Sequence, residues 1–101
     1  MTSVRQTTVH IAIGNSDDKL TQTEWAEYCQ KVAWIVGKYA VAIYGSWFSR
    51  SDDPWQNACW AFEVQPHRAE RAKVELVLAA AKFRQDSISW NESQTEFLET
   101  A

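Results

Sequence analysis

The segment AVAIYGSWFSRSDDPWQNACWAFEV (residues 40–64) contains two strand-forming stretches with no helical stretch between them. Residues 40–48 and 58–64 are rich in β-branched and aromatic residues, and the connection formed by residues 49–55 is short and polar. Two such stretches joined by a short polar loop are typical of a β-hairpin. The middle of the chain is therefore predicted to be a pair of antiparallel strands.

A helix is predicted on the N-terminal side of this hairpin. Thr21 and Glu24 have the spacing of a capping box, in which each residue satisfies a backbone N–H of the other. Apolar residues then recur every three or four positions over residues 25–39, which is the spacing of an amphipathic helix. We expect this helix to end near Gly37 or Lys38.

A second helix is predicted after the hairpin, because Pro66 suits the first turn of a helix and an apolar stripe follows it. The stripe consists of Ala69, Ala72, Leu76, Ala80 and Phe83.

The two outer strands complete the order of elements. Residues 7–13 alternate apolar and polar side chains, which predicts a half-buried strand. Residues 88–90 predict a short last strand, which residues 96–98 are expected to extend or pair with. The order β-α-β-β-α-β predicts an α+β, ferredoxin-like fold: one four-stranded antiparallel sheet with two helices on one face.

The composition suits a single ligand-binding domain over residues 1–101, because 46% hydrophobic and 23% charged residues are typical of a globular protein. No apolar run approaches the roughly 20 residues that span a bilayer, and residues 1–10 lack the apolar segment of a signal peptide. We therefore expect a cytoplasmic protein without a membrane partner. The formal net charge of −3 argues against binding along a nucleic-acid polymer, which needs many Lys and Arg contacts to phosphate.

The faces of the hairpin follow from its register. Symmetric pairing around the loop places Phe48 opposite Gln56 and Trp47 opposite Asn57, with Trp47 and Asn57 on a sheet face that the helices leave open. An apolar, uncovered face of this kind indicates a ligand or a partner. The predicted helix-covered face carries Ala42, Tyr44, Ser46, Phe48, Ala58, Trp60, Phe62 and Val64.

Catalytic, metal and cofactor motifs are weak in this sequence. His10 and His67 are not followed by a hydroxyl residue two positions on, so the paired motifs of two-histidine phosphoesterases are missing. The acidic pairs at 17–18 and 52–53 are more typical of solvated turns than of a cation site. The three glycines form neither a dinucleotide-binding motif nor a P-loop. We expect a protein that is not an enzyme and has neither a metal nor a cofactor.

Aromatic and amide side chains indicate a nucleotide ligand instead. Trp47, Trp55 and Trp90 offer flat surfaces on which a purine can stack, a contact that contributes about 1–3 kcal/mol per base. Gln56 and Asn57 each combine a donor and an acceptor, which suits a base edge or ribose hydroxyls. The alternative is that Trp55 and Trp90 belong partly to the core.

The segment at residues 84–87 adds charge to this candidate site. Arg84, beside Asp86 and Ser87, is placed to hold a phosphate by a charge-assisted hydrogen bond. The alternative is that Arg84 and Asp86 pair with each other at the surface.

Three segments together resemble one known family of small phage proteins. They are IGNSDDKLTQTEW (13–25), the hairpin pattern WxS…WQNACW within residues 47–60, and RQDSISW (84–90). The family is that of the Thoeris anti-defence sponges, which sequester cyclic ADP-ribose isomers, the signals of a bacterial immune system.

The resemblance implies binding without turnover by a homo-oligomer in the host cytoplasm, with ligand pockets near subunit interfaces. It places Trp47 at the stacking position, Asn57 at the amide position, and Arg84 and Asp86 in the segment that closes the pocket. Two other hypotheses stay open on the residues alone. One is a protein-binding inhibitor or adaptor that uses the exposed tryptophans, and the other is a small nucleotide-degrading phosphodiesterase.

Overall fold

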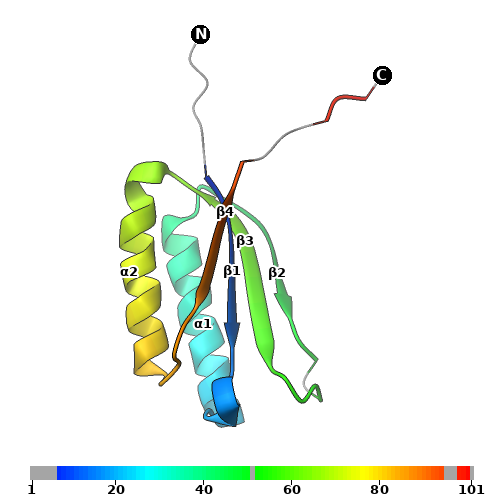
Figure 1. Ribbon diagram of the computed structural model, residues 1–101, viewed down its shortest axis with the longest axis vertical. Coiled ribbons are helices and arrows are strands. Elements are labelled where there is room, and N and C mark those ends of the chain that lie inside the picture. Colours follow the sequence, from blue (N-terminus) through cyan, green and yellow to red (C-terminus); the bar gives the residue numbers. More distant parts are fainter. Residues whose placement is uncertain (1–6, 51, 95–97, 101) are drawn as a thin grey trace.

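The computed structural model describes residues 7–50, 52–94 and 98–100, and it has the predicted β-α-β-β-α-β order (Figure 1). The four strands form one antiparallel sheet in the order β2-β3-β1-β4, with both helices on one face, so the predicted fold class is confirmed. The elements are β1 (Thr7–Gly14), the short 3-10 helix η1 (Ser16–Asp18), α1 (Gln22–Tyr39), β2 (Ala42–Phe48), β3 (Asn57–Val64), α2 (Pro66–Lys82) and β4 (Ser89–Ser93).

Both helices begin where local chemistry predicts. The Thr21 hydroxyl accepts a hydrogen bond from the Glu24 N–H (3.2 Å), and Glu24 Oε1 accepts one from the Thr21 N–H (3.0 Å), which completes the capping box. Helix α1 ends at Tyr39 because Ala40 is extended, with φ −70° and ψ 135°. Helix α2 begins with Pro66, as predicted, and runs antiparallel beside α1 (Figure 1).

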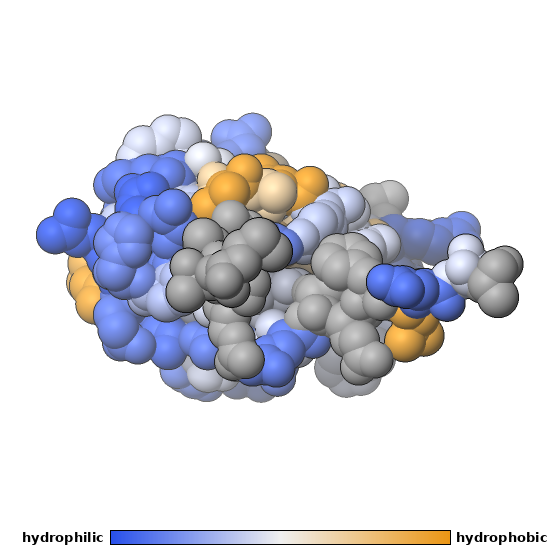
Figure 2. Space-filling view, turned by 90° about the horizontal axis from the view of Figure 1, so that it is seen from above, coloured by the Kyte–Doolittle hydropathy of each residue, from blue (hydrophilic) through white to orange (hydrophobic). Residues whose placement is uncertain are grey.

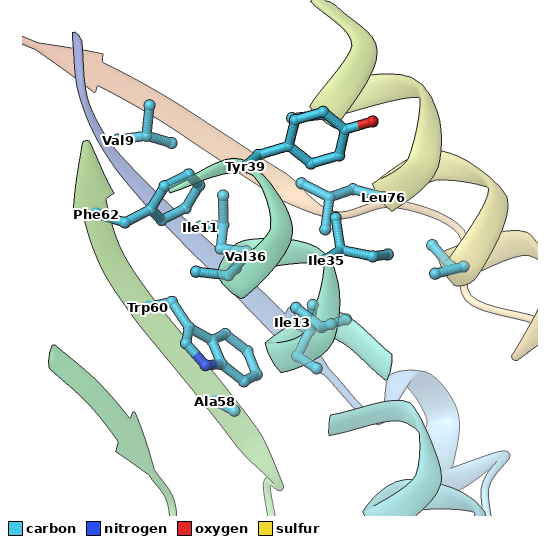
Figure 3. Close-up of a cluster of buried hydrophobic side chains, with 14 of the residues drawn as sticks. Val9, Ile11, Ile13, Ile35, Val36, Tyr39, Ala58, Trp60, Phe62 and Leu76 are labelled. Carbon is cyan, nitrogen blue, oxygen red and sulfur yellow. The ribbon is translucent and has the colours of Figure 1, made fainter. Parts of the chain in front are cut away.

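One apolar core lies between the helices and a single face of the sheet (Figure 3). Strand β1 contributes Val9, Ile11 and Ile13, which are the apolar members of its alternating pattern. Figure 3 shows these side chains, together with Trp60 and Phe62 of β3, directed toward α1 and α2. We call this the helix face of the sheet, and the opposite side the open face.

The hairpin has a different register from the predicted one. Trp47 pairs with Cys59 and Phe48 with Ala58, so the symmetric pairing that placed Phe48 opposite Gln56 is wrong. The loop closes further along β3, where the Ser49 N–H donates to the Asn57 carbonyl at 2.9 Å. Because the offset is an even number of residues, Trp47 still lies on the same face as Asn57.

A bulge between Ile43 and Gly45 reverses the faces at the start of β2. Ile43 lies opposite Phe62 on the helix face, and Ala42 lies opposite Glu63 on the open face. The Tyr44 hydroxyl donates to the Glu63 carboxylate, so Tyr44 also belongs to the open side. The prediction that Ala42 and Tyr44 face the helices is therefore wrong.

Strand β2 is an edge strand, and this position exposes its side chains on both faces. Trp60 is 3% exposed, which confirms its predicted place in the core, whereas Phe48 is 57% exposed. The Phe48 ring packs edge-on against Trp60 at 5.6 Å, but Phe48 remains more than half exposed to solvent. The prediction that the helices bury Phe48 is therefore wrong.

The last strand is longer than predicted, because β4 covers Ser89–Ser93 and pairs with β1 along this length. Ile88 precedes it and packs against the core. Of residues 96–98, the first two lie outside the described residues, and Leu98 is 83% exposed and belongs to no strand.

Candidate ligand-binding surface

The strand registers place eight side-chain positions together on the open face of the sheet. One row runs across all four strands from Trp47 to Ser89, and the next row runs from Gly45 to Asn91. Three of the four inner positions carry small residues and the fourth carries His10, so the open face is low between Trp47 and His10. The rows are Trp47, Cys59, Ala12 and Ser89, and Gly45, Ala61, His10 and Asn91.

Trp47 lies at one edge of this low area. Its indole folds back along β2 over Gly45, where a Cβ atom would stand 3.5 Å from Trp47 Cζ2. The side chain is 56% exposed, so the ring is supported by the backbone and still accessible to solvent. A supported, accessible indole beside small residues is a surface on which a flat ring can stack.

Polar side chains lie across the open face from Trp47. His10 lies opposite Ala61 on one side and Asn91 on the other, and both His10 and Asn91 are exposed. The alternation of residues 7–13 already directs His10 away from the core, but the sequence contains no signal for the position of Asn91. That position depends on the pairing of β4 with β1, which only the folded chain defines.

Asn57 lies at the start of β3, opposite Gly14 rather than Trp47. Its Nδ2 donates to the Trp55 carbonyl at 3.0 Å, so part of the amide is used within the hairpin loop. Trp55 itself is 81% exposed. The loop thus presents a second accessible indole close in sequence to Asn57.

Gln56 has a structural role in this conformation. Its Nε2 donates to Gln22 Oε1 at 2.8 Å, and its Oε1 accepts from Asn15 Nδ2 at 2.9 Å. The Gln56 carbonyl also accepts from the Asn15 N–H at 3.1 Å. These bonds connect the hairpin to the β1–α1 loop and to the start of α1.

Arg84 lies at the end of α2 in the left-handed region, with φ 58°. Its Nη2 donates to Glu24 Oε2 at 2.8 Å and to the Lys19 carbonyl at 3.4 Å. The pKa of the Glu24 carboxyl lies below its usual range, first because of the Thr21 N–H and then because of Arg84. Arg84 is therefore held by a carboxylate, and a phosphate would have to compete with it.

Asp86 and Ser87 lie in the same α2–β4 connection as Arg84, and both are exposed. Asp86 pairs with Lys19 at 3.6 Å, so the alternative that Arg84 and Asp86 pair with each other is wrong. The two acidic groups and two basic groups form a polar cluster around the β1–α1 loop.

The predicted site residues thus form two groups at the same end of the molecule (Figure 1). Trp47, Gln56 and Asn57 belong to the hairpin, whereas Arg84, Asp86 and Ser87 belong to the α2–β4 connection. Within residues 7–50, 52–94 and 98–100, no hydrogen bond or ion pair joins a member of one group to a member of the other.

Trp90, a further candidate for stacking, lies on the helix face. Its ring meets Phe62 edge-on at 6.2 Å, and its Nε1 donates to Glu92 at 2.9 Å. The alternative that Trp90 belongs partly to the core is therefore the correct one.

Residue Gln85, which the sequence reasoning missed, is the side chain that secures this end of the fold. It is 7% exposed, its Oε1 accepts from the Ser16 N–H at 2.9 Å, and its Nε2 donates to the Phe83 carbonyl at 3.0 Å. A glutamine flanked by charged residues in a predicted turn carries no sequence signal of burial.

The acidic pairs take part in turns. Asp17 and Asp18 form η1 with φ values of 54° and 53°, and Asp53 accepts from the Arg50 N–H at 2.8 Å. The described part of the chain contains no group of three or more His, Cys, Asp or Glu side chains that could hold a metal ion. It also contains no helix that is long and apolar enough to cross a membrane.

The fold and the open face define the class of this protein as a small α+β, ferredoxin-like domain. The chain is similar to a dimeric ferredoxin-like protein of unknown function from Thermobifida fusca (TM-score 0.54, 12% identity, 90% of this chain and 92% of that chain). It is also similar to the C-terminal domain of the MgtC protein from Mycobacterium tuberculosis (TM-score 0.51, 12% identity, covering 98% of this chain and 99% of that chain). A third similar structure is that of a DUF3240 family protein from Shewanella baltica (TM-score 0.50, 10% identity, covering 99% of this chain and 99% of that chain).

At these identities the likeness shows the fold alone. No protein-family model matches the chain, and no curated protein matches it in sequence.

Proposed function

We propose that the protein is a phage anti-defence protein that binds a cyclic ADP-ribose-type immune signal in the bacterial cytoplasm and holds it without cleaving it. The observation that carries this proposal is the indole of Trp47, supported over Gly45 and 56% exposed on an uncovered sheet face. The resemblance of residues 13–25, 47–60 and 84–90 to the sponge family supports the same ligand class.

In this proposal the adenine ring stacks on Trp47 and extends over the small residues of the open face. The nearby amide of Asn57 contacts the ligand's hydroxyls, with Trp55 as a second aromatic surface at the loop. His10 and Asn91 are further polar contacts across the face.

In this proposal Arg84 binds the phosphates of the ligand. In one chain Arg84 is held by Glu24 and lies in a different group from Trp47. In this proposal a second copy completes the pocket, and its α2–β4 connection reaches the hairpin of the first. This arrangement is consistent with a homo-oligomer, and the similar protein from Thermobifida fusca is described as dimeric.

The proposal is tested by capture of the intact ligand. The purified protein is incubated with a cyclic ADP-ribose isomer and separated from unbound ligand, and the nucleotide released on denaturation is quantified. We expect stoichiometric recovery of unchanged compound. Trp47→Ala is expected to reduce recovery by about tenfold or more, because a stacked base contributes about 1–3 kcal/mol.

The matched control is Trp34→Ala, which removes an indole of similar exposure (58%) from α1, away from the open face. It is expected to leave recovery unchanged. Equal loss in both variants, or no uptake by the unmodified protein, would refute the proposed function. Recovery of a cleaved product in excess of the protein would show the phosphodiesterase alternative instead.

A second candidate function is a protein-binding inhibitor or adaptor, and the exposed side chains of the β2 edge favour it. Trp47, Tyr44 and Phe48 are each more than half exposed, and aromatic anchors dominate the energetics of protein interfaces. Capture of a host protein that needs no nucleotide, and that Trp47→Ala abolishes, would support this function over the sponge.

A further inference from the structure

A basic hollow lies at the first turns of α2. In Figure 1 this is the opposite end of the helix from the α2–β4 connection, to which Arg84 belongs. It has a volume of about 380 Å³ and is lined by His67, Arg68 and Arg71. Figure 2 looks down on this end of the molecule, and on the side where α2 begins the surface is mainly hydrophilic. Among the residues that the structure describes, no acidic one lines the hollow.

The two arginines differ from most other basic side chains in having no carboxylate partner. Within the described ranges, neither Arg68 nor Arg71 forms an ion pair. The basic residues that do reach a carboxylate are Lys19, Lys38, Arg50, Lys73 and Arg84.

The nearest acidic residues of the same helix are occupied by other groups. Glu70 pairs with Lys73 at 3.0 Å, and Glu75 pairs with Lys38 at 3.1 Å and accepts a hydrogen bond from the Tyr39 hydroxyl. Within the described residues, neither of these carboxylates forms an ion pair with Arg68 or Arg71.

The position of Arg68 is defined by an aromatic contact. Its guanidinium carbon lies 4.7 Å from the centroid of the Tyr39 ring, in a cation–π arrangement. Arg71 follows three residues later, so the two like charges share one face of the helix, where they repel each other. An anion between them would replace this repulsion by charge-assisted hydrogen bonds.

We propose that this hollow binds the phosphate groups of a small phosphorylated ligand, with Arg68 and Arg71 as the principal donors and His67 at the rim. Arginine guanidinium groups match phosphate oxygens with paired N–H donors, and a diphosphate presents enough oxygens for both arginines. The site is separate from the Trp47 surface and does not depend on the proposed function.

The test is an NMR titration of the full chain with inorganic pyrophosphate at low ionic strength, with backbone amides as the probe. We expect saturable shifts of the amides of His67, Arg68 and Arg71. Orthophosphate is expected to bind more weakly at the same amides because it offers fewer oxygens. A parallel titration with adenosine diphosphate distinguishes a site for free diphosphate from one that also accepts a nucleoside.

Arg71→Gln is the informative variant, because Arg71 is exposed and the substitution keeps most of the length of its side chain while removing the charge. It is expected to weaken pyrophosphate binding by about tenfold or more. The control is Lys82→Gln at the other end of the same helix, which removes an exposed charge that pairs with no carboxylate of the described residues. It should leave the affinity unchanged.

Two results would overturn the inference. One is the lack of saturable shifts at the three amides in the unmodified protein. The other is an equal loss of affinity in Arg71→Gln and Lys82→Gln, which would indicate general charge attraction rather than a site.

Discussion

Tyr28 and Tyr39 are both buried residues of α1, but their hydroxyl groups have opposite environments. The Tyr39 hydroxyl donates to the Glu75 carboxylate. The Tyr28 hydroxyl is buried and has no hydrogen-bond partner among the described residues, and burial raises its pKa to about 12. The same chemical change, Tyr→Phe, should therefore affect stability in opposite directions at the two positions.

The magnitude for Tyr28→Phe follows from what the substitution keeps and what it removes. The ring keeps its stacked contact with Phe83 (5.0 Å, interplanar angle 26°) and its edge contact with Trp25 (6.2 Å). It loses only a buried, unpaired hydroxyl, whose desolvation costs about 1–3 kcal/mol. We expect the free energy of unfolding to rise by about 1 kcal/mol, which raises Tm by about 4–8 °C in a domain of this size.

Thermal and denaturant unfolding of the two variants, followed by circular dichroism, measures these changes. Tyr28→Phe should raise Tm, and Tyr39→Phe should lower it because the Glu75 carboxylate loses a donor. If Tyr28→Phe lowers Tm, or if both variants shift Tm in the same direction, the hydroxyl of Tyr28 has a partner and the reasoning is refuted.

Three further outcomes are expected. Arg84→Gly removes a charge and should leave Tm unchanged or raise it by a few degrees. The reason is that Arg84 has φ 58°, a conformation that costs a non-glycine residue about 1 kcal/mol. A marked fall in Tm would show that the bond from Arg84 to Glu24 contributes more to stability than the backbone strain costs. The pKa of Glu24 is lowered in the folded state, so the contribution of Glu24 to stability is present above about pH 4.5 and is lost as the pH falls further. The Glu24→Gln variant should therefore lose less stability on acidification than the unmodified protein. Parallel profiles of Tm against pH for the two proteins would contradict this. Burial raises the pKa of Cys29 to about 11, so at neutral pH maleimide should label Cys59, which lies on the open face, before it labels Cys29. Equal rates of labelling at the two cysteines would contradict this. Protection of Cys59 from the reagent would show that the open face is covered.

Much of the architecture was predictable because it depends on local chemistry. The Thr21–Glu24 capping box, the proline at the start of α2 and the alternation of β1 each act within a few residues, and the structure shows all three. The order of these elements restricts the topology to very few choices, because the two strands of the hairpin between the helices must pair with each other in one sheet.

The candidate site was predictable only in part. The alternation of β3 correctly separated the buried Trp60 from the open side of the sheet. The bulge at Ile43 and Gly45 was not predictable, because a single inserted residue changes the face of its neighbours without changing composition or pattern. The exposure of Phe48 also depends on something outside the hairpin, namely how far the helices extend over the sheet.

The residues of this chain alone specify where its helices and strands begin and which side of each is apolar, because capping, turn formation and alternation are short-range effects. Two things depend on the folded chain: the two-residue offset that pairs Trp47 with Cys59, and the bond that joins Arg84 to Glu24 across 60 residues. Register and long-range ion pairs are set by the packing of whole elements against one another, and neighbouring residues in the sequence carry little information about them.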